Sequence, residues 1–207
     1  MGRETLKEGF ARFRERHGNC ADELTARGQT PEYLFIGCMD SRAAAEIVFD
    51  LKPGDCFGDR PMGTLVPPYK DGDMLSIQNN AKFAFAASIG VSTIVVMGHT
   101  DCGVAEGLAK GLDHPQITPW LEAGKPQNMN DNEAFDRNAI EREIPISSYN
   151  NALSHPALQE NIESGTFDVI VLLYDMHNAQ ILEYNPSKQQ WSIFAQDASL
   201  SHDQKCK

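Results

Sequence analysis

The run Thr93-Ile94-Val95-Val96-Met97 is rich in β-branched residues and shows no alternation of polar and apolar side chains. A strand with one face in water alternates, whereas a parallel strand covered on both faces does not. The runs at 33–36 and 168–174 have the same apolar character. The sequence therefore predicts three buried strands at the centre of a mainly parallel sheet.

Helical patterns separate these strands, which is typical of an α/β fold with helices flanking the sheet. We expect helices over these ranges: 4–17, 43–49, 74–89, 104–110, 138–153 and 156–165. Residues 179–184 and 191–194 predict an antiparallel hairpin at the sheet edge. The length favours one domain over 1–207, with an N-terminal helical arm at 1–28, an exposed loop at 124–137 and a C-terminal tail at 196–207.

The composition excludes several classes of protein. Lys and Arg number 18 against 29 Asp and Glu, a net charge of −11, which argues against nucleic acid or an anionic membrane as partner. The apolar runs are strand-sized and too short to span a membrane. Residues 1–8 lack the apolar segment of a secretory signal, and five cysteines are widely spread. We therefore expect a cytoplasmic protein with free or metal-bound thiols.

Metal-binding side chains follow two of the predicted strands. Residues 38–42 read Cys-Met-Asp-Ser-Arg, and residues 98–103 read Gly-His-Thr-Asp-Cys-Gly. Ligand sites of open parallel sheets lie beyond the C-terminal ends of the strands. The thiolates of Cys38 and Cys102 and the imidazole of His99 form a set that suits tetrahedral zinc, although buried core thiols remain an alternative.

Asp40 has two possible roles at such a site. It completes the metal shell as a fourth ligand, or it pairs with Arg42, whose planar guanidinium holds a carboxylate in two parallel hydrogen bonds. In the second case the fourth position is open to water and the zinc is catalytic. The residues alone leave both roles open.

The motifs at 38–42 and 99–103, in this order, resemble those of the β-class carbonic anhydrases, and the resemblance extends over most of the chain. It implies one zinc ion per chain, held by Cys38, His99 and Cys102. It also implies a gate in which Asp40 closes the zinc shell at rest and Arg42 holds it away in the active state.

The resemblance implies a reaction as well: reversible hydration of carbon dioxide to bicarbonate and a proton, by attack of zinc-bound hydroxide. We expect hydroxide to displace Asp40 from the metal more readily as the pH rises. The substrate-binding positions correspond to Gln29, Phe57 and Gly103. Family members are at least dimers whose N-terminal helix embraces the partner, so we expect a homodimer or a higher even oligomer.

Residues 59–64, Asp-Arg-Pro-Met-Gly-Thr, depart from the family pattern, since Pro61 and Thr64 replace two asparagines. Proline removes a backbone donor and fixes φ, so we expect a reshaped pocket wall. Two alternatives therefore stay open. One is a hydrolase of carbonyl sulfide or carbon disulfide. The other is a non-catalytic zinc protein with Asp40 on the metal, against which the intact Arg42 argues.

Overall fold

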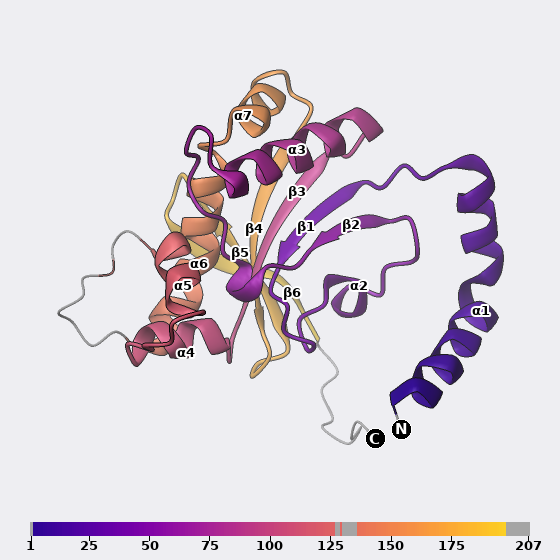
Figure 1. Ribbon diagram of the computed structural model, residues 1–207, viewed down its shortest axis with the longest axis horizontal. Helices are drawn as coiled ribbons and strands as arrows, with labels where there is room; N and C mark the ends of the chain where they lie inside the picture. The colour runs from indigo at the N-terminus through magenta and orange to yellow at the C-terminus, as the bar shows by residue number, and fades with distance from the viewer. Residues whose placement is uncertain (1, 127–128, 130–135, 198–207) are drawn as a thin grey trace.

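The computed structural model describes residues 2–126, 129 and 136–197 (Figure 1). Over these residues the strands form one six-stranded sheet in the order β2-β1-β3-β4-β5-β6. Their bounds are β1 Tyr33–Gly37, β2 Cys56–Asp59, β3 Thr93–His99, β4 Asp168–Asp175, β5 Gln180–Asn185 and β6 Gln190–Gln196. The first four strands are parallel, and β5 and β6 form an antiparallel edge hairpin. The predicted fold class is confirmed, whereas β2 had no counterpart among the predicted strands.

The helices mostly follow the predicted pattern. Their bounds are α1 Gly2–Arg27, α2 Ala45–Val48, α3 Met74–Ile89, α4 Gly103–Ala109, α5 Thr118–Gly124, α6 Arg137–Ala152 and α7 Pro156–Glu163, with a 3₁₀ turn, η1, at Met62–Thr64. The bounds of α3 match the prediction because Asp73 caps its N-terminus and Gly90, in a left-handed conformation, ends it. Neither α5 nor η1 was predicted. Among the helices described, none is long and apolar enough to cross a bilayer.

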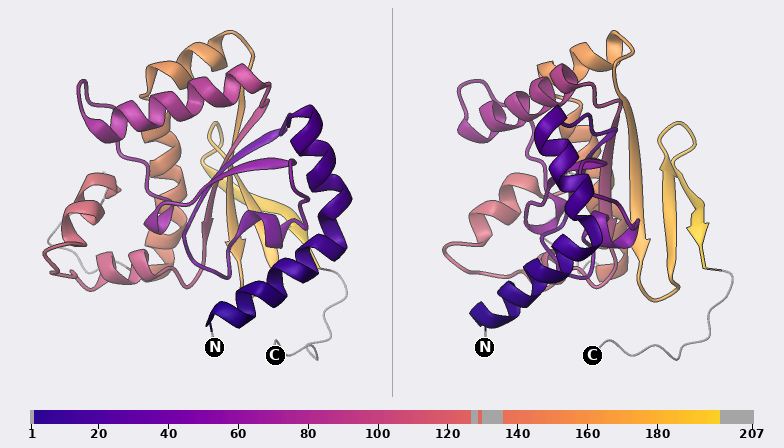
Figure 2. Two further views of the ribbon diagram at one scale, coloured as in Figure 1. Left: turned by 45° about the vertical axis from the view of Figure 1, so that its right-hand side comes forward. Right: turned by 90° about the vertical axis from the view of Figure 1, so that its right-hand side faces the viewer.

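Alternate residues of the central strands bury two different cores. Leu34, Ile36 and Val96 face α3, α6 and α7 on one side of the sheet. Phe35, Val95 and Met97 face the other side, where they pack with residues of α2 and β5. Figures 1 and 2 show α3, α6 and α7 together on the first side, with α3 and α7 at one end of the sheet. The sheet is therefore covered on both faces, as the absence of alternation in β3 predicted.

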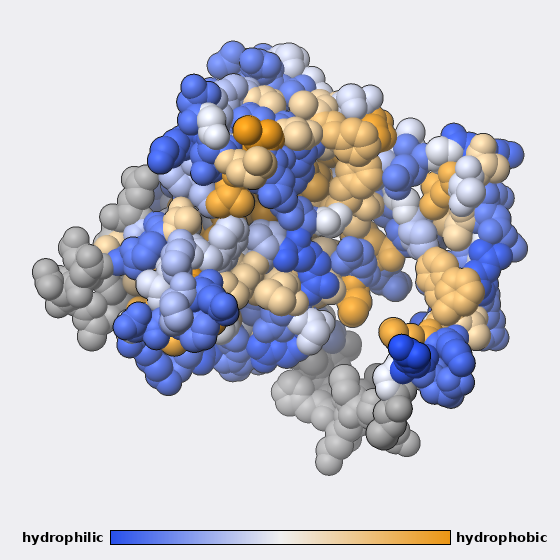
Figure 3. Space-filling model, viewed as in Figure 1, coloured by the Kyte–Doolittle hydropathy of each residue, from blue (hydrophilic) through white to orange (hydrophobic). Residues whose placement is uncertain are grey.

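The N-terminal helix runs to Arg27, so it is longer than the helix predicted over 4–17 and extends along most of the helical arm predicted over 1–28. Gly18 does not stop it, and Cys20 and Leu24 continue its inward face against the turn at Pro53-Gly54. The first half of α1 leaves the body, so that Leu6 is 75% and Phe10 64% exposed. Figure 3 shows this helix standing apart from the rest of the molecule with apolar side chains uncovered.

Candidate metal centre

The candidate ligands meet because two parallel strands end side by side. Gly37, the last residue of β1, lies level with Met97 of β3. Cys38 follows β1 directly, His99 is the last residue of β3, and Cys102 is the N-cap residue of α4. The structure thus brings together three residues that the sequence places on two separate segments.

Their donor atoms form a buried cluster that fits a metal ion. The Sγ atoms of Cys38 and Cys102 and a ring nitrogen of His99 all lie within 4.8 Å of one another. The Nδ1 atom of His99 lies 2.8 Å from the carbonyl oxygen of Thr100, and since a carbonyl only accepts, Nδ1 carries the proton. Nε2 therefore presents a lone pair, yet this atom is buried and has no hydrogen-bond partner. Two sulfurs and one free imidazole nitrogen match the donor set of a catalytic zinc site with one open position.

Cys38 is surrounded by donors that favour its thiolate. Its pKa lies below the ordinary value because the Cys102 thiol donates a hydrogen bond to it. The backbone N–H groups of Asp40 and Gly63 add two more, at 3.4 and 3.3 Å. Gly63 has a φ of 76°, and a Cβ there would lie 2.6 Å from the side chain of Val104. Glycine alone fits this approach to the sulfur.

Asp40 and Arg42 are paired beside the cluster. Arg42 donates from Nε and Nη2 to the two Asp40 carboxylate oxygens at 3.0 and 2.8 Å, and its backbone N–H donates at 2.9 Å. These bonds hold the pKa of Asp40 down to about 2. Arg42 Nη2 also donates to the carbonyl oxygen of Asp101 at 3.1 Å. The guanidinium thus joins the two motif segments.

The segment that departs from the family pattern lies against the same strand ends. Arg60 donates from Nε to the carbonyl of Cys38 at 3.0 Å. Thr64 is buried and donates from Oγ1 to the carbonyl of Met97 at 3.0 Å. Pro61 precedes η1, and Met62 lines a pocket with Cys38. The segment therefore contributes Met62 to the pocket wall beside Cys38, while Thr64 contacts the end of β3.

That pocket has a volume of about 240 Å³ and is mostly apolar. Its lining residues are Cys38, Met39, Asp40, Met62, Gly103, Val104, Leu112, Ile117 and Leu121. Gly103 and Asp40 thus line the same pocket as the candidate ligand Cys38. A small apolar molecule has room here within reach of the ligands.

The other two predicted substrate residues lie elsewhere in this chain. Phe57, on β2, is level with Leu34 near the start of β1 and packs against Phe85 of α3, with ring centroids 5.8 Å apart. The four steps along the strand from Leu34 to Cys38 span about 13 Å of extended chain. Gln29 is exposed and precedes β1, at the opposite end of that strand from Cys38. The structure does not bring Gln29 or Phe57 to the metal cluster of their own chain.

Two residues of α6 that the sequence did not predict also belong to the site. Glu141 is buried and accepts the backbone N–H of Cys102 at 3.1 Å. Arg137 donates to Glu141 at 2.8 Å and also forms an ion pair with Asp101. Their i, i+4 spacing signals only a helical salt bridge, so the sequence alone could not connect them to Cys102.

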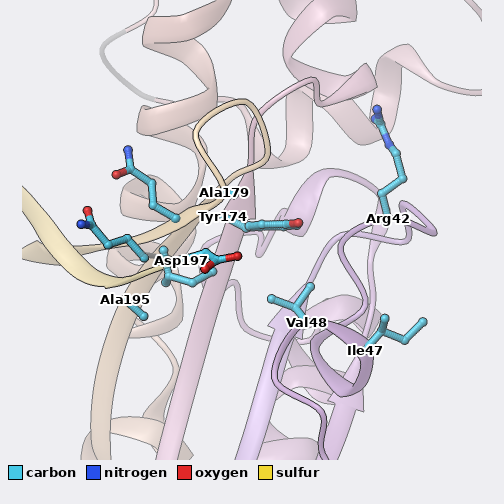
Figure 4. A pocket seen from close by; sticks show the side chains of 10 residues that line it. Arg42, Ile47, Val48, Tyr174, Ala179, Ala195 and Asp197 are labelled. Carbon is cyan, nitrogen blue, oxygen red and sulfur yellow. The ribbon is translucent and has the colours of Figure 1, made fainter. Parts of the chain in front are cut away.

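A second pocket, of about 340 Å³, lies between the Arg42 side chain, α2 and the β5–β6 hairpin (Figure 4). Ile47 and Val48 form one wall, and Tyr174 and Ala179 form another. In Figure 4 the Arg42 guanidinium points away from Ile47 and Val48. This pocket contains none of the three candidate metal ligands.

Comparison with known proteins places the chain in a family. The family model described as carbonic anhydrase matches residues 33–181. A carbonic anhydrase of Pseudomonas aeruginosa is 31% identical over 84% of this chain and 84% of its own length. A chloroplastic β carbonic anhydrase 5 of Arabidopsis thaliana is 28% identical, covering 80% of this chain and 59% of its own.

Solved structures share the fold. The β-carbonic anhydrase CcaA superposes with a TM-score of 0.76 at 24% identity, covering 95% of this chain and 93% of that one. A structure of tetrameric β-carbonic anhydrases from Sordaria macrospora gives a TM-score of 0.65 at 23% identity, covering 87% and 96%. Together with the family match and the Cys-His-Cys cluster, these similarities show that the chain belongs to the carbonic anhydrase family, in its β class.

Proposed function

We propose that this protein catalyses the reversible hydration of carbon dioxide to bicarbonate and a proton, with zinc held by Cys38, His99 and Cys102. The observation that carries the proposal is the buried Nε2 of His99, which has no hydrogen-bond partner although a ring nitrogen of His99 and the two Sγ atoms lie within 4.8 Å of one another. Cys38 of this cluster also lines an apolar pocket. When bound there, zinc lowers the pKa of a coordinated water to near 7, so that a nucleophile is available at neutral pH.

The apolar pocket suits carbon dioxide, which is uncharged and needs little polar binding. Met62, Val104 and Leu121 supply its walls. Cys38 and Gly103 lie on its border with the ligand cluster. We assign this pocket the role of holding the substrate and keeping competing water away from it.

Asp40 and Arg42 form the proposed gate. The bidentate pairing orients the Asp40 carboxylate beside the ligand cluster. Because the pKa of Asp40 is held at about 2, this group is an anion at neutral pH and acts as a hydrogen-bond acceptor. Release from Arg42 would free the same oxygens to serve as a fourth ligand, which is the resting state in this proposal.

The proposed assembly is a homodimer or a higher even oligomer. Gln29 and Phe57 lie away from the metal cluster of their own chain, which suits a cleft lined by two subunits. The exposed Leu6 and Phe10 of α1 need cover from another surface. The Sordaria macrospora relatives of similar fold are described as tetrameric.

The proposed location is the cytoplasm. Cys38 and Cys102 serve as ligands only as thiolates, and Cys20 and Cys56 are also free thiols. A reducing compartment keeps all four available. Zinc ligation by two cysteines is consistent with such a setting.

Stopped-flow measurement of carbon dioxide hydration, followed from neutral to alkaline pH, tests the proposal. The zinc-loaded protein is expected to turn over rapidly and faster as the pH rises. If one zinc per chain is confirmed and no hydration is seen at any pH, the protein is a non-catalytic zinc binder or acts on another substrate.

The gate has its own test within the same assay. Asp40→Ala is expected to lower kcat/KM by about 10- to 100-fold, because the carboxylate that orients the reacting group is lost. Asp71→Ala, an exposed aspartate distant in the fold, is the matched control and should behave as the unmodified protein. Wild-type turnover in Asp40→Ala would contradict the gate.

A further inference from the structure

The peptide unit between Asp101 and Cys102 is hydrogen-bonded at both its C=O and its N–H. Its carbonyl oxygen, from Asp101, accepts a hydrogen bond from Arg42 at 3.1 Å. Its N–H, from Cys102, donates to Glu141 Oε1 at 3.1 Å. Because a peptide unit is planar, its C=O and N–H turn together, so one rotation would break both bonds.

Without these hydrogen bonds, the observed orientation of this peptide would be unfavourable. Asp101 has a φ of 58°, in the left-handed region that side-chain-bearing residues adopt at a cost. Cys102 precedes α4 as its N-cap, so its N–H has no carbonyl acceptor within the helix. Cys102 is also buried, so that water does not replace the missing acceptor.

Glu141 meets this need and is itself held in place. Its side chain is 1% exposed, and a buried carboxylate is costly unless it is paired and hydrogen-bonded. Arg137 provides the pairing through Nε, while its other nitrogens reach the carboxylates of Asp101 and Glu106. Arg137 thus fixes Glu141 and the Asp101 side chain at once.

We propose that Glu141, fixed by Arg137, is a positioning residue that sets the orientation of the Asp101–Cys102 peptide. That orientation fixes the position of the Cys102 thiolate and of the carbonyl oxygen to which Arg42 donates. The inference rests on the proposed zinc site. It gives α6, which lies outside the two motifs, a role in the metal centre. Removing a hydrogen-bond partner of a metal ligand typically lowers metal affinity or activity by about 10- to 100-fold.

The test compares zinc affinity, by competition with a chromophoric chelator, and the visible absorption of the cobalt-substituted protein. Glu141→Leu removes the acceptor and is expected to weaken zinc binding by about 10- to 100-fold and to change the cobalt spectrum. Glu141→Gln keeps an oxygen acceptor for Cys102 and should recover most of the loss. Glu160→Gln, on an exposed turn of α7, is the matched control.

Arg137→Lys covers the case in which Glu141→Leu fails to fold. Arg137 is partly exposed, and a lysine cannot reach three carboxylates with one planar fork. We expect zinc binding to weaken by roughly tenfold, the lower end of the range above. Wild-type zinc affinity and an unchanged cobalt spectrum in the folded variants would overturn the inference.

The outcomes also separate this inference from the proposed function. If the unmodified protein binds no zinc or hydrates no carbon dioxide, the proposed function fails. If the unmodified protein does both and the Arg137 and Glu141 variants match it, only the positioning role fails. A loss of thermal stability without a change in zinc affinity or cobalt spectrum means that Glu141 is merely structural, and this result also overturns the inference.

Discussion

The metal cluster and the N-terminal helix differ in how completely their own chain satisfies them. At the cluster, Cys38 and Glu141 have hydrogen-bond partners from distant segments, and Asp40 is paired with Arg42. The first half of α1, in contrast, exposes Leu6 and Phe10 to solvent. The cluster is thus formed by side chains of this chain, whereas the apolar side chains of α1 are left uncovered by it.

This difference separates two kinds of function in one molecule. Chemistry at the cluster depends on ligands that one chain supplies in full, apart from the metal. The proposed assembly would instead use the side chains of α1 that the chain leaves exposed. Substitutions should therefore affect zinc binding and oligomeric state separately.

The largest effect is expected from removing a ligand. His99→Ala deletes the nitrogen that the cluster leaves free, so we expect no retained zinc and no hydration above the uncatalysed rate. His17→Ala, the corresponding change on α1, should keep both, as measured by metal analysis and stopped-flow assay. Equal zinc content in the two variants would remove His99 from the ligand set.

A large but different effect is expected on α1. The double variant Phe10→Asp and Phe13→Asp places charge on its exposed apolar side, where burial of each ring would contribute about 1.5–3 kcal/mol. We expect a smaller species by light scattering, with zinc content unchanged. Arg12→Ala, on the same helix, is the control. An unchanged oligomer in the double variant would contradict a role for α1 in assembly.

The smallest effect concerns acid stability just outside the cluster. Burial raises the pKa of Asp175, but hydrogen bonds from Asn178, Gln180 and backbone N–H groups outweigh it, so its pKa lies below the ordinary value. A lowered carboxyl pKa stabilises the folded state above the unfolded pKa of about 3.9, and the stabilisation is lost as the pH falls below it. Asp175→Asn should therefore be less stable than the metal-free parent near neutral pH, with the difference shrinking in acid.

Urea unfolding at several pH values measures this difference in free energy. Asp22→Asn provides the contrast, because Asp22 is an exposed residue of α1 paired with Arg14. Exposed ion pairs contribute little to stability, so this variant should follow the parent at every pH. A pH-independent difference for Asp175→Asn would show that its charge is not the cause.

The sequence predicted the elements whose signals are local. Strand β3 and helix α3 could be located because an apolar run, a cap at Asp73 and a stop at Gly90 lie within the segments themselves. The helix α1 was predicted too short, because Gly18 resembles a stop when the contacts of Leu24 with the Pro53-Gly54 turn are unknown. Strand β2 was missed because Gly58 and Asp59 have low strand propensity. The segment is held as a strand by its pairing with β1.

The candidate site shows the same division. The sequence placed Cys38, His99 and Cys102 at strand ends, and parallel pairing brings strand ends together. It could not find Glu141 or Arg137, since their relation to Cys102 exists only after α6 packs on the sheet. Local patterns therefore predict the donor atoms, while tertiary packing decides what holds them.

Gly63 has a consequence for how such a sequence can diverge. Its left-handed backbone and its approach to Val104 exclude a side chain, and its N–H, which donates to Cys38 Sγ, excludes proline. Pro61 and Met62, immediately before it, are not restricted to glycine, and Met62 lines the pocket beside the cluster. Gly63 is thus fixed, whereas Pro61 and Met62 before it are free to vary. Mutation at these two positions can remodel the loop and its pocket wall without disturbing the Cys38 sulfur, to which Gly63 donates.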